Sequence, residues 1–230
     1  MAAASRFDRA PARQVLADHV YETLMTSLVD GRLAAGESLN IDALSRELSI
    51  SQTPIREALA RLESTGLVVR EALRGYRVAP LFSPDELAEL MEARIALEPQ
   101  LARMAGAAGD ADLVRGLRDS NGALSRYRER KGESLASYWQ ADERFHRLIA
   151  EGAGNRFLLA SYTALGGHVQ RFRLFGGLDV SDADAAVSEH ERIIDAIAAA
   201  DGDASFTAMH DHVCSVKQRA IAEASTLPTA

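Results

Sequence analysis

The chain of 230 residues has an ordinary soluble composition, with 47% hydrophobic residues, 26% charged residues and a net charge of −7. Its one cysteine, Cys214, excludes an intrachain disulfide framework, and no apolar run approaches the roughly 20 residues of a membrane span. The first residues lack the apolar core of a secretory signal. We therefore expect a cytoplasmic protein with no membrane partner.

The charge is spread unevenly along the chain. Residues 1–80 hold ten Lys/Arg and ten Asp/Glu, whereas the remainder holds sixteen and twenty-three. A neutral front part beside an acidic back part indicates two modules. The acidic total argues against a nonspecific nucleic-acid coat, but it leaves room for a local DNA-binding face.

The front module is expected to contain three helices and a β-hairpin. Helices are predicted over 15–30, 42–49 and 52–65, where Gly31 and Gly66 act as stop signals. Two short β-rich runs, at 67–69 and 76–79, flank the segment REALRG and predict the hairpin. Helix, helix, helix and hairpin is the order of a winged helix-turn-helix.

The back module is expected to be an all-α antiparallel bundle. Ser83, Pro84 and Glu86 form a capping-box pattern, which predicts a helix start after a short hinge. Helical runs follow at 84–107, 110–130, 133–151, 155–176, 181–200 and 203–224. The predicted organisation is a flexible arm (1–13), a winged helix-turn-helix (14–80), a hinge (81–85), the bundle (86–224) and a tail (225–230).

The third predicted helix has an apolar face and an open face. Ile55, Leu59 and Leu62 share the apolar face, which leaves Arg56 free to read guanine in a major groove. Periodicity alone equally allows ordinary solvated charges here. The candidate DNA-contacting residues of the front module are Arg46, Ser51, Gln52, Thr53, Arg56, Arg61, Arg74 and Gly75.

The stretch IDALSRELSISQTPIREALARLESTGLVV closely resembles the DNA-binding domain of the GntR family of bacterial transcription regulators. The resemblance covers about residues 12–80 and rests on Ser51, Thr53, Pro54, Arg56, Glu57, Ala58, Leu59, Leu62, Gly66, Leu67 and Gly75. The family often has an arginine between the Ser and the Thr, where this chain has Gln52. Glutamine can pair with adenine, so this difference bears on the operator sequence.

Ionisable side chains fall on apolar faces in the back module. In YWQADERFHRLI, Asp142 and His146 share the helical sector of Phe145 and Ile149, and His190 lies near the centre of another apolar face. A shared divalent metal would satisfy such inward polar groups. A fourth ligand should come from the last helix, where the spacing leaves His210 and His212 equally open.

The bundle is similar to the FCD effector domain of the FadR subfamily of GntR regulators, across about residues 84–224. The matched pattern is Asp-x-x-Phe-His at 142–146, Asn155 after a glycine, Glu-His at 189–190 and a final His after Met-x-x. The resemblance implies a metal site made of Asp142, His146, His190 and His212. Such an oxygen and nitrogen set suits zinc first, and nickel or manganese as well.

The resemblance also implies a site for a carboxylate effector. Arg94 matches the arginine that helps bind carboxylates in this subfamily, and a guanidinium facing a metal makes a good carboxylate clamp. Arg94 and Glu98 lie four residues apart on one apolar face, so a buried ion pair is the other interpretation. Asn155 and Arg171 are further candidates for lining the effector pocket.

Together these features predict a ligand-responsive regulator, a repressor and not an enzyme. It would bind a pseudopalindromic operator as a homodimer and sense a small organic acid. A metal-dependent hydrolase with an accessory winged helix is the alternative, which four protein ligands and the lack of a His-Glu-x-x-His pattern disfavour. A nonspecific architectural DNA binder is a third class, disfavoured by the acidic charge.

Overall fold

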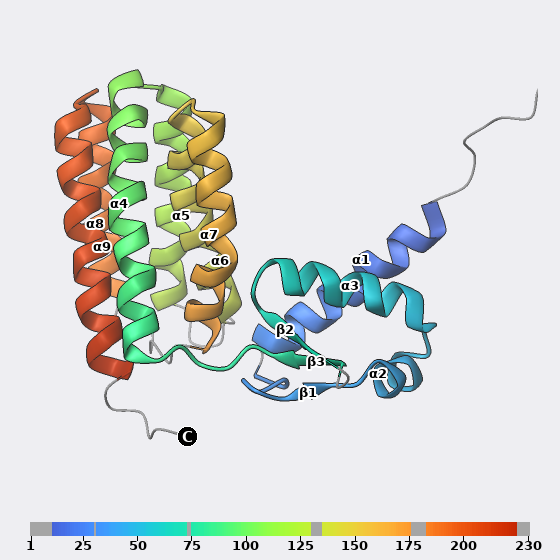
Figure 1. Cartoon of the computed structure of the whole chain (residues 1–230). Coiled ribbons are helices and arrows are strands. Elements are labelled where there is room, and N and C mark those ends of the chain that lie inside the picture. Colours follow the sequence, from blue (N-terminus) through green and yellow to red (C-terminus); the bar gives the residue numbers. More distant parts are fainter. Residues whose placement is uncertain (1–10, 30, 73–74, 130–134, 176–182, 225–230) are drawn as a thin grey trace, which may run out of the picture. The chain divides into compact units, whose positions relative to one another are not determined.

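The computed structural model describes residues 11–29, 31–72, 75–129, 135–175 and 183–224 (Figure 1). The chain divides into two compact units, residues 1–80 and residues 81–230. In the described ranges, no helix is both long enough and apolar enough to cross a membrane.

The first unit is a winged helix-turn-helix, as predicted. Its helices are α1 (Pro11–Val29), α2 (Ile41–Leu48) and α3 (Gln52–Ser64), and its strands are β1 (Ser38–Leu39), β2 (Val68–Glu71) and β3 (Gly75–Val78). The strands form one antiparallel sheet in the order β1-β3-β2, in which Val68 pairs with Val78. The two-residue strand β1 was not predicted, because a strand of that length has no periodicity to detect.

The core of this unit follows the apolar spacing of α1 and α3. Ile55, Leu59 and Leu62 of α3 are fully buried, as their spacing predicts. They pack with the buried face of α1, which contributes Val20, Leu24 and Leu28. Burial of each such side chain stabilises the fold by about 1.5–3 kcal/mol. This core holds α3 in place and leaves its opposite face exposed.

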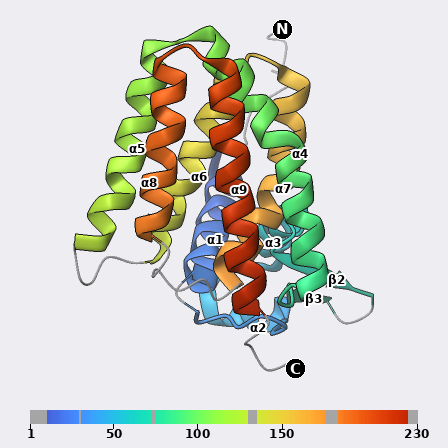
Figure 2. The ribbon, with the colours of Figure 1, turned by 90° about the vertical axis from the view of Figure 1, so that its left-hand side faces the viewer.

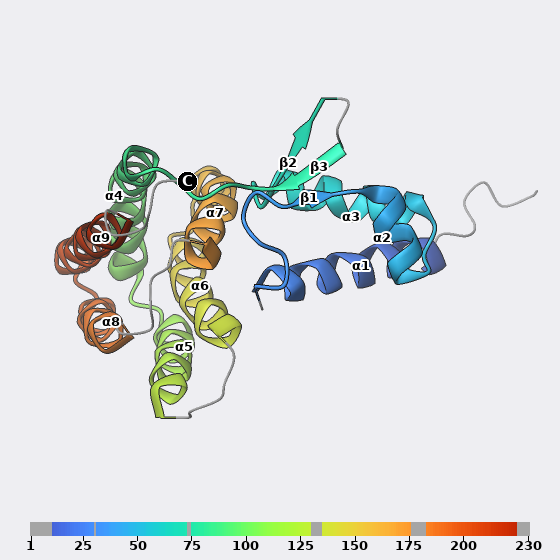
Figure 3. The ribbon, with the colours of Figure 1, turned by 90° about the horizontal axis from the view of Figure 1, so that it is seen from below.

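The second unit is an all-α bundle, which confirms the predicted fold class. Its helices are α4 (Pro84–Ala108), α5 (Ala111–Glu129), α6 (Leu135–Gly152), α7 (Arg156–Phe175), α8 (Ala183–Ala198) and α9 (Gly202–Ala224). Figure 2 shows α9 between α8 and α4, and Figure 3 shows the helices end-on in the ring order α4, α9, α8, α5, α6, α7. The ring encloses the largest cluster of buried apolar side chains, which includes Leu117, Phe145 and Ile193.

Two glycines allow α4 and α9 to approach closely. A Cβ atom at Gly106 would lie 2.2 Å from Oγ of Ser205, and one at Gly202 would lie 2.8 Å from the carbonyl oxygen of Arg103. Both distances are shorter than real contacts, so any larger residue would push the helices apart. The close approach keeps α9, which carries His212, firmly against α4.

The start of α4 carries the predicted capping box. Oγ of Ser83 accepts a hydrogen bond from the amide of Glu86 at 3.2 Å, and Oε2 of Glu86 accepts one from the amide of Ser83 at 2.8 Å. Replacing Ser83 with alanine removes one partner of this pair. We expect the free energy of unfolding of the bundle to fall by about 1 kcal/mol, measured by urea denaturation. Ser188→Ala, an exposed change within α8, is the control and should cost less.

Candidate metal centre and DNA-reading face

Three histidines from three helices meet inside the bundle. His146 lies on α6, His190 on α8 and His212 on α9, and all are buried. Each offers a ring nitrogen, and these three nitrogens lie within 4.8 Å of one another. Asp142, one turn before His146, joins them, because its Oδ1 lies 3.6 Å from Nε2 of His190 and 3.9 Å from Nε2 of His146. The structure therefore clusters the three histidines and places Asp142 beside two of them.

The structure also separates the two histidines that spacing left open. The side chain of His212 is 2% exposed and lies in the cluster, with its Nε2 3.3 Å from Nε2 of His146. His210 is half-buried elsewhere on α9, where its ring lies near Sγ of Cys214 and stacks on Phe206. The helix turns by about 200° over two residues, so only one of the two can face the core.

Two buried glutamates lie beside two of these histidines. Oε2 of Glu98 lies 2.7 Å from Nδ1 of His146, and Oε2 of Glu189 lies 2.7 Å from Nδ1 of His212. Each glutamate is in turn paired with an arginine. Arg94 contacts Glu98 at 2.6 Å, and Arg219 contacts both carboxylate oxygens of Glu189 at 2.9 and 3.1 Å. Two Arg-Glu-His series therefore lead to the cluster, one from α4 and the other from α9 through Glu189 of α8.

The charges of these chains are set by their neighbours. Burial raises the pKa of Glu98, but Arg94 and His146 lower it more strongly, so the pKa lies well below its usual value. Burial also raises the pKa of Glu189, yet hydrogen bonds from His212 and Arg219 bring it down to about 2. Burial lowers the pKa of His212, which favours a neutral ring. Both glutamates are therefore anionic at neutral pH, and the lowered pKa of His212 favours a neutral ring that can offer a lone pair to a metal ion.

The protonation of the rings makes the cluster suited to a cation. A carboxylate beside Nδ1 favours a proton on that nitrogen, which leaves Nε2 with a lone pair. In His146 and His212 the two Nε2 atoms face each other at 3.3 Å. Two lone pairs at this distance repel unless one ring carries a proton on Nε2 or a cation lies between them. Two nitrogens bound to a tetrahedral zinc ion would be separated by about 3.3 Å, so the spacing fits.

His190 is positioned by packing. Its ring is fully buried and stacks on Phe145, with ring centroids 3.8 Å apart and planes within 4° of parallel. Phe145 comes from the same helix as Asp142 and His146, so one turn of α6 supplies two candidate ligands and the surface that holds the third. A rigid arrangement of this kind keeps ligand nitrogens in place before an ion binds.

The three residues expected to bind an effector have different surroundings. Arg94 is buried near the cluster, but its guanidinium is bound to Glu98 through Nε and Nη2. Asn155 accepts hydrogen bonds from the amides of Phe157 and Leu158, so it caps the start of α7, and this role accounts for it without an effector. The side chain of Arg171 lies outside the described residues.

Sequence reasoning missed Arg219, which holds Glu189. The signal was present, because Arg219 follows His212 by seven residues and so lies on the same face of α9. The functions of Glu98 and Glu189 as ring-orienting groups were also absent from the predicted site. Each acts across two helices, and periodicity describes only one helix at a time.

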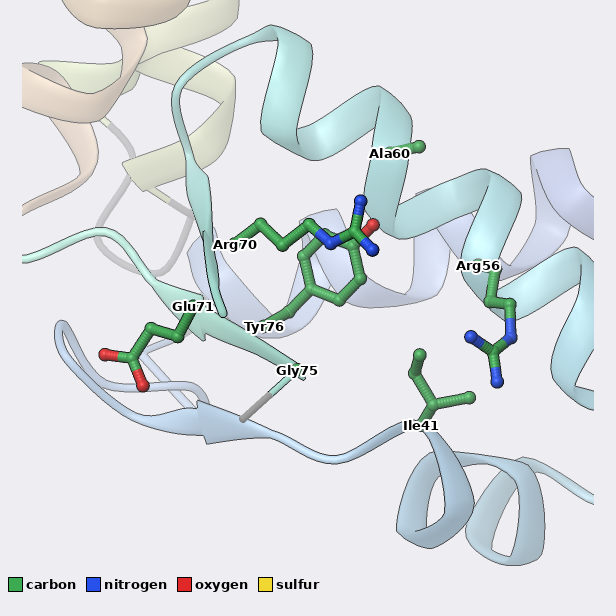
Figure 4. A pocket seen from close by; sticks show the side chains of 7 residues that line it. All are labelled: Ile41, Arg56, Ala60, Arg70, Glu71, Gly75 and Tyr76. Carbon is green, nitrogen blue, oxygen red and sulfur yellow. The ribbon is translucent and has the colours of Figure 1, made fainter. Parts of the chain in front are cut away.

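In the first unit, α3 and the wing border a hollow of about 560 Å³ (Figure 4). Arg56 of α3 and Arg70 of β2 extend into it from opposite sides, and Gly75 and Tyr76 of β3 line its floor. Gly75 has φ +93°, a conformation that disfavours other residues. The hollow places two guanidinium groups between a recognition helix and a wing.

Gln52 connects Arg56 to the preceding helix. Its Nε2 donates a hydrogen bond to Oδ1 of Asp42 at 2.5 Å, and its Oε1 accepts one from Nη2 of Arg56 at 3.0 Å. All three side chains are exposed. The glutamine that stands where the family often has arginine therefore uses both ends of its amide to orient Arg56. Asp42 is an additional residue of this face that the sequence did not indicate.

Four of the five other predicted DNA contacts lie in the described part of the first unit. Ser51 and Thr53 are exposed at the start of α3, and Arg46 is exposed in the last turn of α2. Ser51, the N-cap of α3, makes no side-chain capping bond. Arg61 is exposed, but it pairs with Asp18 of α1 at 2.5 Å and lies over the ring of Tyr21. Arg61 therefore braces α1 against α3. Arg74 lies outside the described residues.

A winged helix-turn-helix followed by a helical domain with a buried polar cluster defines a class of one-component transcription regulator. Residues 16–78 match the family described as bacterial regulatory proteins, gntR family, and residues 89–214 match the FCD domain. The chain belongs to the GntR family of DNA-binding transcription regulators and carries an FCD domain, consistent with the FadR-like subfamily.

Relatives of known name support this class. The chain is 29% identical over 202 residues to the HTH-type transcriptional regulator BphR of Paraburkholderia xenovorans, covering 86% of this chain and 82% of that protein. It is 31% identical over 203 residues to the "Probable D-xylose utilization operon transcriptional repressor" of Paenarthrobacter nicotinovorans, covering 87% of each. Its fold matches a GntR regulator from Rhodococcus sp. RHA1 with a TM-score of 0.72 at 19% identity, covering 90% of this chain and 97% of that one. These findings give no support to the hydrolase alternative.

Proposed function

We propose that this regulator is a homodimeric repressor whose FCD domain binds a small organic acid at a divalent metal ion. Asp142, His146, His190 and His212 would hold the ion, with zinc the first choice and nickel or manganese also suited to three nitrogens and one oxygen. The observation that carries the proposal is the facing pair of Nε2 atoms at 3.3 Å, each belonging to a ring whose Nδ1 lies beside a carboxylate.

The metal supplies a fixed positive charge that a carboxylate can bind, since a bound cation is often the largest local charge in a site. Glu98 and Glu189 would hold the rings of His146 and His212 in the required tautomer. Arg94 contacts Glu98, which in turn lies beside His146 of the cluster. We propose that Arg94 pairs with the acid. To do so it must share its guanidinium between Glu98 and the incoming carboxylate. The acid therefore competes with a buried ion pair, which favours acids that also bind the metal.

DNA recognition would use the face around Arg56. Arg56 would read a base edge in the major groove, and Ser51, Thr53 and Arg46 would contact phosphates near the start of α3. A two-fold symmetric dimer reads two half-sites, so the operator would be pseudopalindromic. The acid would bind one arrangement of the dimer more tightly than the other and so change operator affinity.

The proposal is tested by selecting bound sequences from random DNA with the full-length protein, and then titrating the selected operator in the presence of small mono-, di- and hydroxycarboxylates. We expect one pseudopalindrome to be enriched, and at least one acid to weaken its binding by about 5- to 150-fold in metal-loaded protein. The same acid should have no effect after treatment with a chelator. An acid that acts equally with and without metal would contradict the metal-based site, and a failure to enrich any sequence would contradict sequence-specific binding.

A further inference from the structure

We propose that the outer face between α5 and α6 binds a small phosphorylated anion. Three arginines line one hollow of about 480 Å³ there: Arg118 and Arg126 on α5 and Arg144 on α6. The hollow lies on the far side of α6 from the metal centre, because Arg144 and His146 are separated by about 200° around the helix axis. It is therefore a separate site from the histidine cluster.

In the described part of the bundle these three arginines have no acidic partner, whereas five other arginines do. Within the described residues, Arg118, Arg126 and Arg144 form no ion pair, although Asp119 lines the same hollow. Other arginines of the unit are paired: Arg94 with Glu98, Arg103 with Asp203, Arg115 with Asp112, Arg147 with Glu151 and Arg219 with Glu189. The three arginines and Asp119 give the lining of the hollow a net charge of about +2, although the whole chain has a net charge of −7. This local positive charge favours the binding of an anion.

A buried hydrogen bond joins the two helices that form the hollow. Oγ of Ser120, which is buried, donates a hydrogen bond to the carbonyl oxygen of Ala141 at 2.6 Å, and this joins α5 to α6 beneath it. Gly122 lies midway between Arg118 and Arg126 along α5. A Cβ atom at Gly122 would lie 3.6 Å from Nη1 of Arg126, so this guanidinium extends back along α5 towards Gly122. All three arginines lie on helices, so the positions of their Cα atoms are fixed by the packing of α5 against α6.

The spacing and the charge favour a phosphorylated ligand over a simple carboxylate. Arg118 and Arg126 originate about 12 Å apart along α5, so the arginines suit an anion whose charge extends over more than one group. Guanidinium groups bind phosphate through paired hydrogen bonds. The volume of the hollow is within the roughly 300–1,000 Å³ typical of small-molecule sites. A diphosphate group, free or part of a metabolite, matches these features.

The test is a calorimetric titration of the full-length protein with inorganic pyrophosphate at constant ionic strength. We expect saturable binding that becomes at least about tenfold weaker in the double variant Arg126→Gln/Arg144→Gln, because each charged hydrogen bond to phosphate contributes about a factor of ten. The matched control is Arg115→Gln/Arg147→Gln. It removes the same charge from the same two helices, but from arginines that are already paired with acids.

A third variant leaves every charge in place. Gly122→Met fills the centre of the hollow, and it should weaken pyrophosphate binding as strongly as the double variant while the far-ultraviolet circular dichroism stays unchanged. Three results would overturn the proposal: no saturable binding by the native protein, equal weakening in both double variants, or unchanged affinity in Arg126→Gln/Arg144→Gln. The last of these, accompanied by a change in oligomeric state, would assign this face to contact between subunits.

Discussion

Replacing Arg56 with alanine is expected to weaken operator binding by about 1–3 kcal/mol for each half-site, and by about twice that in a two-fold symmetric dimer. Arg56 is exposed on α3 and extends into the hollow between that helix and the wing. Its hydrogen bond to Gln52 lies on the surface, so the free energy of unfolding should change by less than about 0.5 kcal/mol. Fluorescence anisotropy with a selected operator measures the affinity.

Arg61→Ala is the matched control, because it removes the same charge from the same helix. Arg61 is bound to Asp18 and Tyr21 of α1, so its removal should lower stability slightly and affect operator affinity less than Arg56→Ala does. Equal losses of affinity in the two variants would mean that α3 contributes only general positive charge. In that case the assignment of base reading to Arg56 would be wrong.

Comparison of Arg56 with Arg61 shows what the sequence could and could not predict about this face. The helical period correctly placed both arginines on the exposed side of α3. It could not show that α1 supplies an aspartate and an aromatic ring to one of them, because that contact spans 43 residues of sequence. The link from Asp42 through Gln52 to Arg56 was hidden for the same reason, since its first step joins two helices.

The bundle shows the same division between local and long-range information. Apolar spacing predicted the buried faces that carry Asp142, His146 and His190, and the capping pattern predicted the start of α4. Spacing could not choose between His210 and His212, because both lie beside the apolar face of α9; the resemblance to FCD domains made that choice. The contacts of Glu98 with His146 and of Glu189 with His212 depend on which helices are neighbours in the ring. The apolar spacing within one helix does not show which other helices pack against it.

His212→Ala and His210→Ala provide the decisive comparison for the metal centre. Both remove one imidazole from α9, but only His212 belongs to the cluster. We expect elemental analysis to find about one divalent ion per chain in the native protein and in His210→Ala, and almost none in His212→Ala or Asp142→Ala. Glu189→Gln keeps every candidate ligand but replaces the carboxylate beside Nδ1 of His212, so its metal affinity should fall by about 10- to 100-fold.

Thermal unfolding separates a bound ion from a network of buried polar groups. An ion that binds only the folded state raises the free energy of unfolding by about 4 kcal/mol at a free concentration a thousand times its Kd. A chelator should therefore lower the melting temperature of the native protein and of His210→Ala, but leave that of His212→Ala unchanged. If the native protein contains no metal and takes up no zinc, nickel or manganese, the four residues form a polar core network. The metal-based account of the effector would then be abandoned, whereas the DNA-reading face of α3 would stand, because the contacts that define it lie within the first unit.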